Sequence, residues 1–462
     1  MEIFIVSVFV LGYLAITLEH TLKIDKLVPA LLMMALAWAG IAFGLDSFPN
    51  WFDSHAGSMV DGFKDLPMHA DHVKGAIQHG PASKSDWMES TLLHHFGKTC
   101  EILMFLVGAM TIVEIIDHFN GFNTIKRIIK TRKKSLLLWI VCILGFILSA
   151  IIDNLTATIV LITILRKLVK DGNLRMWYAG MIIVAANAGG AWSPIGDVTT
   201  TMLWMGNKVT AMQLIIKLLL PSLVCMIVPT VIASFLPAFK GNMAADEDGE
   251  DETSPHGTKM LVLGLLMIVF VPIFKTVTHL PPYVGMMLSL SIVALVAEFI
   301  SSREFSMTSV AEHENGGSHH SSPTFGALSK IEMPSILFFL GILMTVAAME
   351  SLGLIFNFGQ DVNKALNTDI FITLLGAGSA VIDNVPLVAA SMGMFQHEID
   401  HETWHFIAYA AGTGGSMLII GSAAGVVAMG MEKISFFWYL KKISLLALVG
   451  YLAGVAVFLL FK

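Results

Sequence analysis

The chain has 462 residues, of which 55% are hydrophobic and only 14% are charged. Soluble domains carry about 25% charged residues, so this composition excludes an ordinary soluble enzyme or binding domain. The net charge of −7 also argues against a nucleic-acid partner. Several apolar runs approach or exceed the roughly 20 residues that a helix needs to cross a bilayer. Backbone groups in lipid must bond within their own segment, so we predict an all-α polytopic membrane protein with membrane lipid around it.

A basic segment at 126–134 is the clearest marker of orientation, because cytoplasmic loops are enriched in Lys and Arg. A second basic cluster, at 166–175, follows soon after. One apolar stretch lies between the two and is interrupted at Asp153-Asn154. Since both of its ends should face the cytoplasm, we expect a re-entrant hairpin over about 135–166, with its tip near the middle of the membrane.

Taken in chain order, the remaining apolar stretches predict about ten full crossings. Those of the first half are about 3–18, 28–44, 101–117, 177–206 (a broken helix) and 211–237. Those of the second half are about 259–277, 283–300, 333–356, 404–430 (again broken) and 443–461. We expect an external loop at 45–98 and a cytoplasmic loop at 301–330.

The chain is thus expected to consist of two transmembrane halves, 1–240 and 259–462. An acidic cytoplasmic linker at 241–258 joins them. The second half carries its own hairpin, at about 369–395, which should open to the outside.

An internal repeat supports this division. The first half reads LSAIIDNLTATIV and then AANAGGAWSPIGDVTTTM, and the second reads GSAVIDNVPLVAA and then AAGTGGSMLIIGSAAGVV. Each half therefore has an Ile-Asp-Asn tip followed by a Gly-Gly break. Two hairpins of opposite entry and two discontinuous helices predict an inverted-topology repeat, which is the plan of many secondary transporters.

The two Asp-Asn tips and the segment NAGGAWSPIGDVTTTM resemble the NhaD-type sodium/proton antiporters of the ion transporter superfamily. The resemblance covers nearly the whole chain. It implies an antiporter, and a homodimer of hairpin-containing subunits. The superfamily also holds arsenite exporters and sodium/dicarboxylate carriers, so the resemblance supports the fold more strongly than the substrate.

A carboxylate in the middle of a membrane is costly and is a functional candidate by default. Asp153 and Asp383 meet this condition at matching positions. Removal from water favours the protonated carboxyl, so sodium and protons can compete for one group. We expect sodium at Asp153, Asn154, Asp383 and Asn384, with Asp197 as a further candidate. The full set of expected ion- or proton-binding residues is Asp153, Asn154, Thr156, Asn187, Asp197, Thr199, Thr200, Asp383, Asn384, Thr413 and Ser422.

Each candidate also has a structural interpretation. Asp153 and Asp383 could cap hairpin helices, and the Asn residues could do the same. Asp197 could be the N-cap of a half-helix. Its counterpart in the repeat is Ser422, so only the first half carries this charge.

The leading hypothesis is the exchange of cytoplasmic sodium, or lithium, for external protons by alternating access, in the service of pH homeostasis. The expected location is a bacterial inner membrane. A sodium-coupled dicarboxylate or citrate carrier and an arsenite exporter stay open, although central carboxylates would repel an anion. A membrane enzyme is disfavoured because the sequence has no GxSxG or phosphate-loop motif. We expect no cofactor; sodium and protons are substrates.

Overall fold

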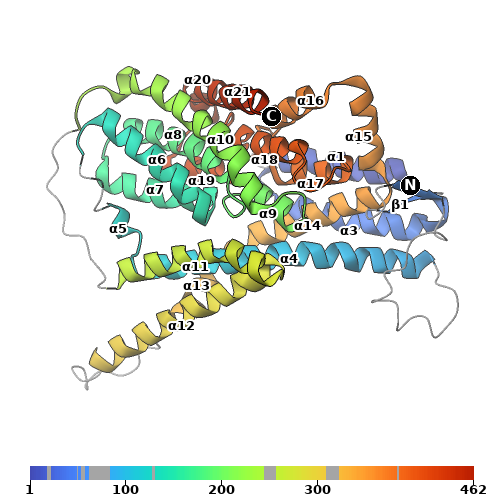
Figure 1. The fold of residues 1–462 in the computed structure, drawn as a ribbon, viewed down its shortest axis with the longest axis horizontal. Helices are drawn as coiled ribbons and strands as arrows, with labels where there is room; N and C mark the ends of the chain where they lie inside the picture. The colour runs from blue at the N-terminus through green and yellow to red at the C-terminus, as the bar shows by residue number, and fades with distance from the viewer. Residues whose placement is uncertain are drawn as a thin grey trace. The chain divides into compact units, whose positions relative to one another are not determined.

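The computed structural model describes residues 1–17, 22–48, 50–53, 58–61, 84–126, 129, 131–243, 256–308, 322–381 and 384–462. This part of the chain is almost entirely helical (Figure 1). Seven of its helices are long and apolar enough to cross a membrane, or up to eight if the bent pair Phe436–Lys442 and Ser444–Leu460 is one span. The chain is therefore an all-α polytopic membrane protein, and it divides into two compact units.

Unit 1 comprises Met1–Leu103, Glu332–Ile372 and Val385–Glu398. Its elements are α1 (Glu2–Thr17), α3 (Leu27–Gly44), η1 (Leu45–Ser47), β1 (Asn50–Asp53), β2 (Ser58–Asp61), α14 (Met333–Ser351), α15 (Leu354–Ala365), the first part of α4 (Lys84–His118) and of α16 (Thr368–Gly378), and most of α17 (Asn384–Met394). The strands β1 and β2 pair antiparallel.

The centre of unit 1 is the contact between α3 and α14. Trp38 Nε1 donates to the carbonyl of Met344 at 2.9 Å, which satisfies the indole inside an apolar interface. The two backbones approach closely at Gly341, where a Cβ would overlap the backbone of Ala30. Small residues are what allow such close helix packing in membranes.

Unit 2 comprises Met104–Ile331, Thr373–Asn384 and Ile399–Lys462. Besides the remainder of α4 and α16, its elements are α5 (Asn123–Lys126), α6 (Lys134–Ile152), α7 (Asn154–Leu168), α8 (Gly172–Gly190), α9 (Val198–Met205), α10 (Ala211–Ser234), η4 (Pro237–Phe239), α11 (Gly257–Thr278), α12 (Pro282–Thr308), α13 (Pro323–Lys330), α18 (Glu402–Gly414), α19 (Ala423–Glu432), α20 (Phe436–Lys442) and α21 (Ser444–Leu460).

Helices α6 and α7 form a hairpin that packs on α8 (Figure 1). At one end, Tyr178 of α8 donates to the carbonyl of Lys134, the first residue of α6, at 2.9 Å. At the other end, Ser149 donates to the carbonyl of Ala186 at 2.6 Å. Helices α6 and α8 therefore run parallel, and α7 returns between them. The predicted hairpin is present in the fold, and its depth in a bilayer stays a prediction.

The two broken helices, α8–α9 and α18–α19, run antiparallel to each other within unit 2. The end of α19 meets the start of α8 through the ion pair between Glu432 and Arg175. The end of α9 meets the start of α18, since the amide of Asp400 donates to the carbonyl of Lys208 at 2.9 Å. The two broken helices thus have opposite directions in this unit, and the opposite entry of the two hairpins stays a prediction.

Several predicted boundaries were wrong. The expected loop 45–98 contains η1, β1 and β2, and α4 already begins at Lys84. The expected loop 301–330 contains the end of α12 and all of α13. An unforeseen amphipathic helix, α15, follows α14. Most of the linker 241–258 lies outside the described residues, so it and the division into halves stay predictions, as does the count of ten crossings.

Candidate functional site

The tip of the first hairpin is a single non-helical residue, Asp153, between α6 and α7. Its φ of 75° is rare for a residue with a side chain and ends α6 abruptly. Its carboxylate accepts from both the backbone N and the Oγ1 of Thr156, each at 2.8 Å. Asp153 is half-buried. It is the N-cap of α7, and Thr156 is its partner in that cap.

The break in the first discontinuous helix brings a second carboxylate to the same place. Helix α8 ends at Gly190, and α9 begins after Asp197, which is its N-cap. The Oδ1 of Asp197 accepts from the backbone N and the Oγ1 of Thr199, each at 2.8 Å. Only 2% of Asp197 is exposed, so this is a buried charge site at a helix N-terminus, where the helix dipole stabilises an anion.

The asparagines of both hairpins converge on Asp197. Asn154 Nδ2 donates to Asp197 Oδ2 at 2.7 Å, and Asn384 Nδ2 lies 3.2 Å and 3.3 Å from the two carboxylate oxygens. Asn154 and Asn384 are 8% and 5% exposed. Because amide N–H groups face it, the charge of Asp197 is satisfied by donors from both repeats.

A second chain of hydrogen bonds joins the two helix breaks. Asn154 Nδ2 also donates to Asn187 Oδ1 at 3.1 Å, and Asn187 Nδ2 donates to Ser422 Oγ at 3.0 Å. Ser422 is the N-cap of α19 and accepts from the backbone N of Gly425 at 3.2 Å. We call the five side chains of Asn154, Asn187, Asp197, Asn384 and Ser422 the central cluster.

Other expected residues lie at or beyond its edge. Thr200 Oγ1 donates to the carbonyl of Asp197 at 2.9 Å, and Thr413 Oγ1 donates to the carbonyl of Tyr409 at 2.6 Å. Both hydroxyls therefore have backbone partners in their own segments. Asp383 lies outside the described residues, so its place in the site stays a prediction.

The two repeats build these breaks with the same contacts. Ser149 donates to the carbonyl of Ala186, and Ser379 donates to that of Ala411, at 2.6 Å and 2.8 Å. A Cβ at Gly189 would overlap the backbone of Phe146, and one at Gly414 would overlap the backbone of Gly376. The N-caps also match: Asp197 has φ −148° and ψ 147°, and Ser422 has φ −146° and ψ 152°.

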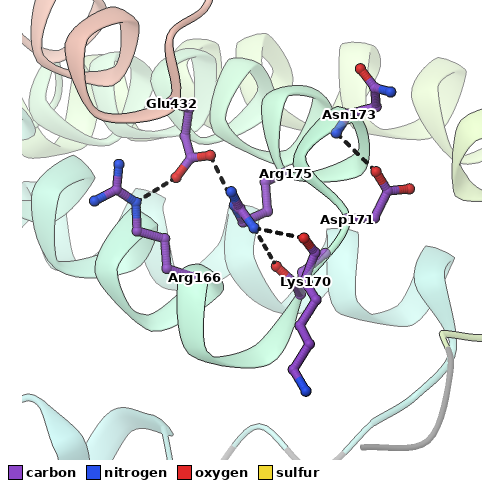
Figure 2. A network of polar contacts seen from close by, with 7 residues as sticks. Arg166, Lys170, Asp171, Asn173, Arg175 and Glu432 are labelled. Atoms are coloured by element: carbon purple, nitrogen blue, oxygen red, sulfur yellow. Dashed lines mark hydrogen bonds and ion pairs between the residues drawn. The ribbon is translucent and has the colours of Figure 1, made fainter.

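A charged network that the sequence analysis missed lies at the other end of the same helices (Figure 2). Glu432 contacts Arg166 at 2.7 Å and Arg175 at 2.8 Å. In the sequence, the two arginines indicate only orientation. One signal was available, because Glu432 is the only acidic residue between 403 and 462.

Comparison with known proteins places this arrangement in a family. A family model described as "Citrate transporter" matches residues 13–404. Sodium/proton antiporter 1 of Arabidopsis thaliana is 42% identical over 374 residues, which are 80% of this chain but only 63% of that protein.

Two bacterial relatives align along nearly the whole chain. The Na(+)/H(+) antiporter NhaD of Alkalimonas amylolytica is 30% identical over 474 residues, covering 98% of this chain and 89% of that protein. NhaD of Vibrio cholerae is 28% identical over 470 residues, covering 98% and 90%. The chain therefore belongs to the citrate-transporter family of membrane proteins and, within it, is of the NhaD type.

Proposed function

We propose that this protein exchanges sodium, or lithium, for protons at the central cluster, with Asp197 as the ion-binding carboxylate. The observation that carries the proposal is the convergence of Asn154 and Asn384 on a buried Asp197. The names of the relatives, which are sodium/proton antiporters in a plant and in bacteria, support the same choice of substrates.

The chemistry of the cluster suits a small hard cation. Carboxylate, amide, hydroxyl and backbone oxygens are ligands that such cations prefer. Asp197 supplies the carboxylate, Asn154 and Asn384 supply amide oxygens, and the hydroxyls of Thr199 and Ser422 lie beside them. Both amides direct their N–H groups at the carboxylate. A bound cation requires these amides to rotate and present oxygen instead.

A single buried carboxylate is enough to couple the two substrates. A proton and a sodium ion cannot both neutralise Asp197, so the binding of one releases the other. Asp153 precedes Asn154, which contacts Asp197, and provides a second carboxylate for a second proton. We therefore expect two protons to be exchanged for one sodium ion, so that the exchange moves net charge.

Alternating access follows from the antiparallel broken helices. The breaks at 191–197 and 415–422 meet at the cluster, so each repeat contributes one half-helix on each side of it. A movement that opens one side and closes the other would expose the same carboxylate alternately to the two aqueous phases.

A citrate or dicarboxylate carrier is the second candidate, favoured by the description of the family model. Such a site must attract an anion, and Asp197 at its centre would repel one. Sodium coupling could neutralise the acid, so this alternative is decided by experiment.

The deciding experiment uses purified protein in proteoliposomes that contain a fluorescent pH indicator. Sodium, lithium and potassium are added in turn as chloride salts, and citrate is added as its choline salt. We expect proton movement on addition of sodium or lithium only. Uptake of labelled citrate without proton movement in response to cations would reject the antiporter. Cross-linking in native membranes tests the expected homodimer, and fractionation of source cells tests the bacterial inner membrane.

A further inference from the structure

Glu432 is a buried carboxylate that the proposed exchange does not use. It is the last residue of α19, and its side chain is only 2% exposed. Its two oxygens accept separately, Oε1 from Arg166 Nε and Oε2 from Arg175 Nε (Figure 2). Arg166 lies at the end of α7 and Arg175 near the start of α8, so one carboxylate joins three helices. We call these three side chains the clamp.

The position of Glu432 has no explanation in helix stability. An acidic side chain at a helix C-terminus faces the negative end of the helix dipole and destabilises the helix. Burial of its charge costs further free energy unless partners are held in good geometry. The arginines supply those partners, and Arg175 is itself anchored, since its Nη1 donates to the carbonyls of Val169 and Lys170 at 2.9 Å and 3.0 Å.

The three helices that the clamp joins are those that carry the central cluster at their other ends. Helix α7 begins at Asn154, α8 carries Asn187 in its last turn, and α19 begins directly after Ser422. With a rise of about 1.5 Å per residue, a ten-residue helix such as α19 places the clamp roughly 15 Å from Ser422. A rigid helix of that length transmits an axial shift from one end to the other.

Packing alone resists such a shift weakly. The sequence of α19 is AAGVVAMGME, and its small side chains form shallow ridges against α7 and α8. The directional ion pairs of Glu432 at one end of α19 fix the axial position of the helix, which the packing of small side chains leaves free.

We infer that Glu432 is a positioning residue that sets the axial register of α19 against α7 and α8 and thereby keeps Ser422 in contact with Asn187. This inference rests on the proposed function for its transport readout. It assigns the clamp a role in sodium affinity, although none of its side chains touches the ion.

The first test replaces the carboxylate with its neutral isostere, Glu432→Gln. The apparent KM for sodium in proteoliposomes should rise about tenfold or more, because Ser422 and Asn187 lose their register. The matched control is Glu402→Gln, which removes a glutamate from a more exposed ion pair with Lys462 (3.0 Å, with the glutamate side chain 45% exposed). Its KM should stay within about twofold of the unaltered protein. An unchanged KM in Glu432→Gln overturns the inference.

A double-mutant cycle distinguishes a change in the axial register of α19 from a general loss of stability. Distant residues normally contribute additively, so Glu432→Gln and Ser422→Ala should multiply their effects on KM if they act independently. If Glu432 acts through Ser422, Glu432→Gln should change KM by less than about twofold once Ser422 is alanine. Multiplicative effects would overturn the inference even if both single variants are impaired.

A readout without substrate keeps the clamp testable if the transport proposal fails. The hydrogen bond from Asn187 Nδ2 to Ser422 Oγ should give a coupling free energy in a thermal-unfolding double-mutant cycle of Asn187→Ala and Ser422→Ala. This coupling should be smaller in the Glu432→Gln background than in the unaltered protein or in Glu402→Gln. Equal coupling would overturn the inference. An absence of sodium-dependent proton flux in the unaltered protein would reject the proposed function instead. If Glu432→Gln does not fold, Arg166→Lys keeps the charge and removes the Nε contact, and it should lower the same coupling to a smaller degree.

Discussion

Substitution of Asp197 by Ser tests the proposed site most directly, because the chain itself shows that serine serves at this position. Ser422, its counterpart, has nearly the same backbone angles and caps α19 through its hydroxyl. Ser and Asp are comparably good N-caps. The variant Asp197→Ser therefore makes the first repeat like the second: it removes the charge and keeps the cap of α9.

The expected loss follows from electrostatics. Two opposite unit charges about 4 Å apart attract by about 4 kcal/mol at an effective dielectric constant of about 20. Since about 1.4 kcal/mol corresponds to a factor of ten, sodium should bind roughly a thousandfold more weakly. Asn154 and Asn384 also lose their charged acceptor. A buried donor without a partner costs about 1–3 kcal/mol, so we expect a lower melting temperature in a protein that still folds.

The assay combines sodium-driven proton flux in proteoliposomes with sodium titration by calorimetry in detergent. The control is Asp171→Ser, the same substitution at the exposed N-cap of α8, where the carboxylate accepts from the backbone N of Asn173 at 2.9 Å. It should leave flux and affinity within about twofold. If folded Asp197→Ser exchanges sodium at the normal rate and affinity, Asp197 is not the ion-binding carboxylate and the reasoning is refuted.

Three further substitutions test other parts of the site. Asn384→Leu removes a side chain whose hydrogen bond to a charged group is worth about 1.5–3 kcal/mol, so the KM for sodium should rise about 10- to 100-fold. An unaltered KM would show that the second hairpin does not contribute to sodium binding. Asp153→Asn keeps the cap of α7 but removes one carboxylate, so exchange should lose its response to an imposed membrane potential, measured with a potassium gradient and valinomycin. Gly189→Ala forces a methyl group against the backbone of Phe146 and should cost about 1–3 kcal/mol of stability by thermal unfolding, whereas Gly97→Ala, where the space is open, should be neutral or stabilising.

The sequence predicted those features of the fold that have local causes. Asp153-Asn154 interrupts an apolar run, and the Gly189-Gly190 pair with Pro194 interrupts another, so hairpin and break could both be located from the residues alone. The repeat then located the second break, at Gly414-Gly415, by analogy. These signals were sufficient because Gly, Pro and cap residues act within one or two turns of their own position.

The centre of the site depended on contacts between distant segments and could not be ranked from the sequence. By sequence alone Asp153 is the better candidate because it stands alone in an apolar run, yet it caps its own helix and is only half-buried. Asp197 receives donors from both hairpins, and this convergence exists only in the folded chain. Glu432 was missed for the same reason, since its arginines lie more than two hundred residues away in the sequence.

The duplication explains why, in the described part of the site, only one of the two matching N-caps carries a charge. The repeats place two N-caps, Asp197 and Ser422, in one cluster with matching backbones; Ser422 contacts Asn187, and Asp197 contacts Asn154. If both were acidic, two carboxylates in a buried cluster would repel each other, and one would retain a proton through the cycle. Serine in the second repeat keeps the helix cap without the charge. The symmetric backbone can then open to either side, while only one of the two caps carries a carboxylate for which sodium and a proton must compete.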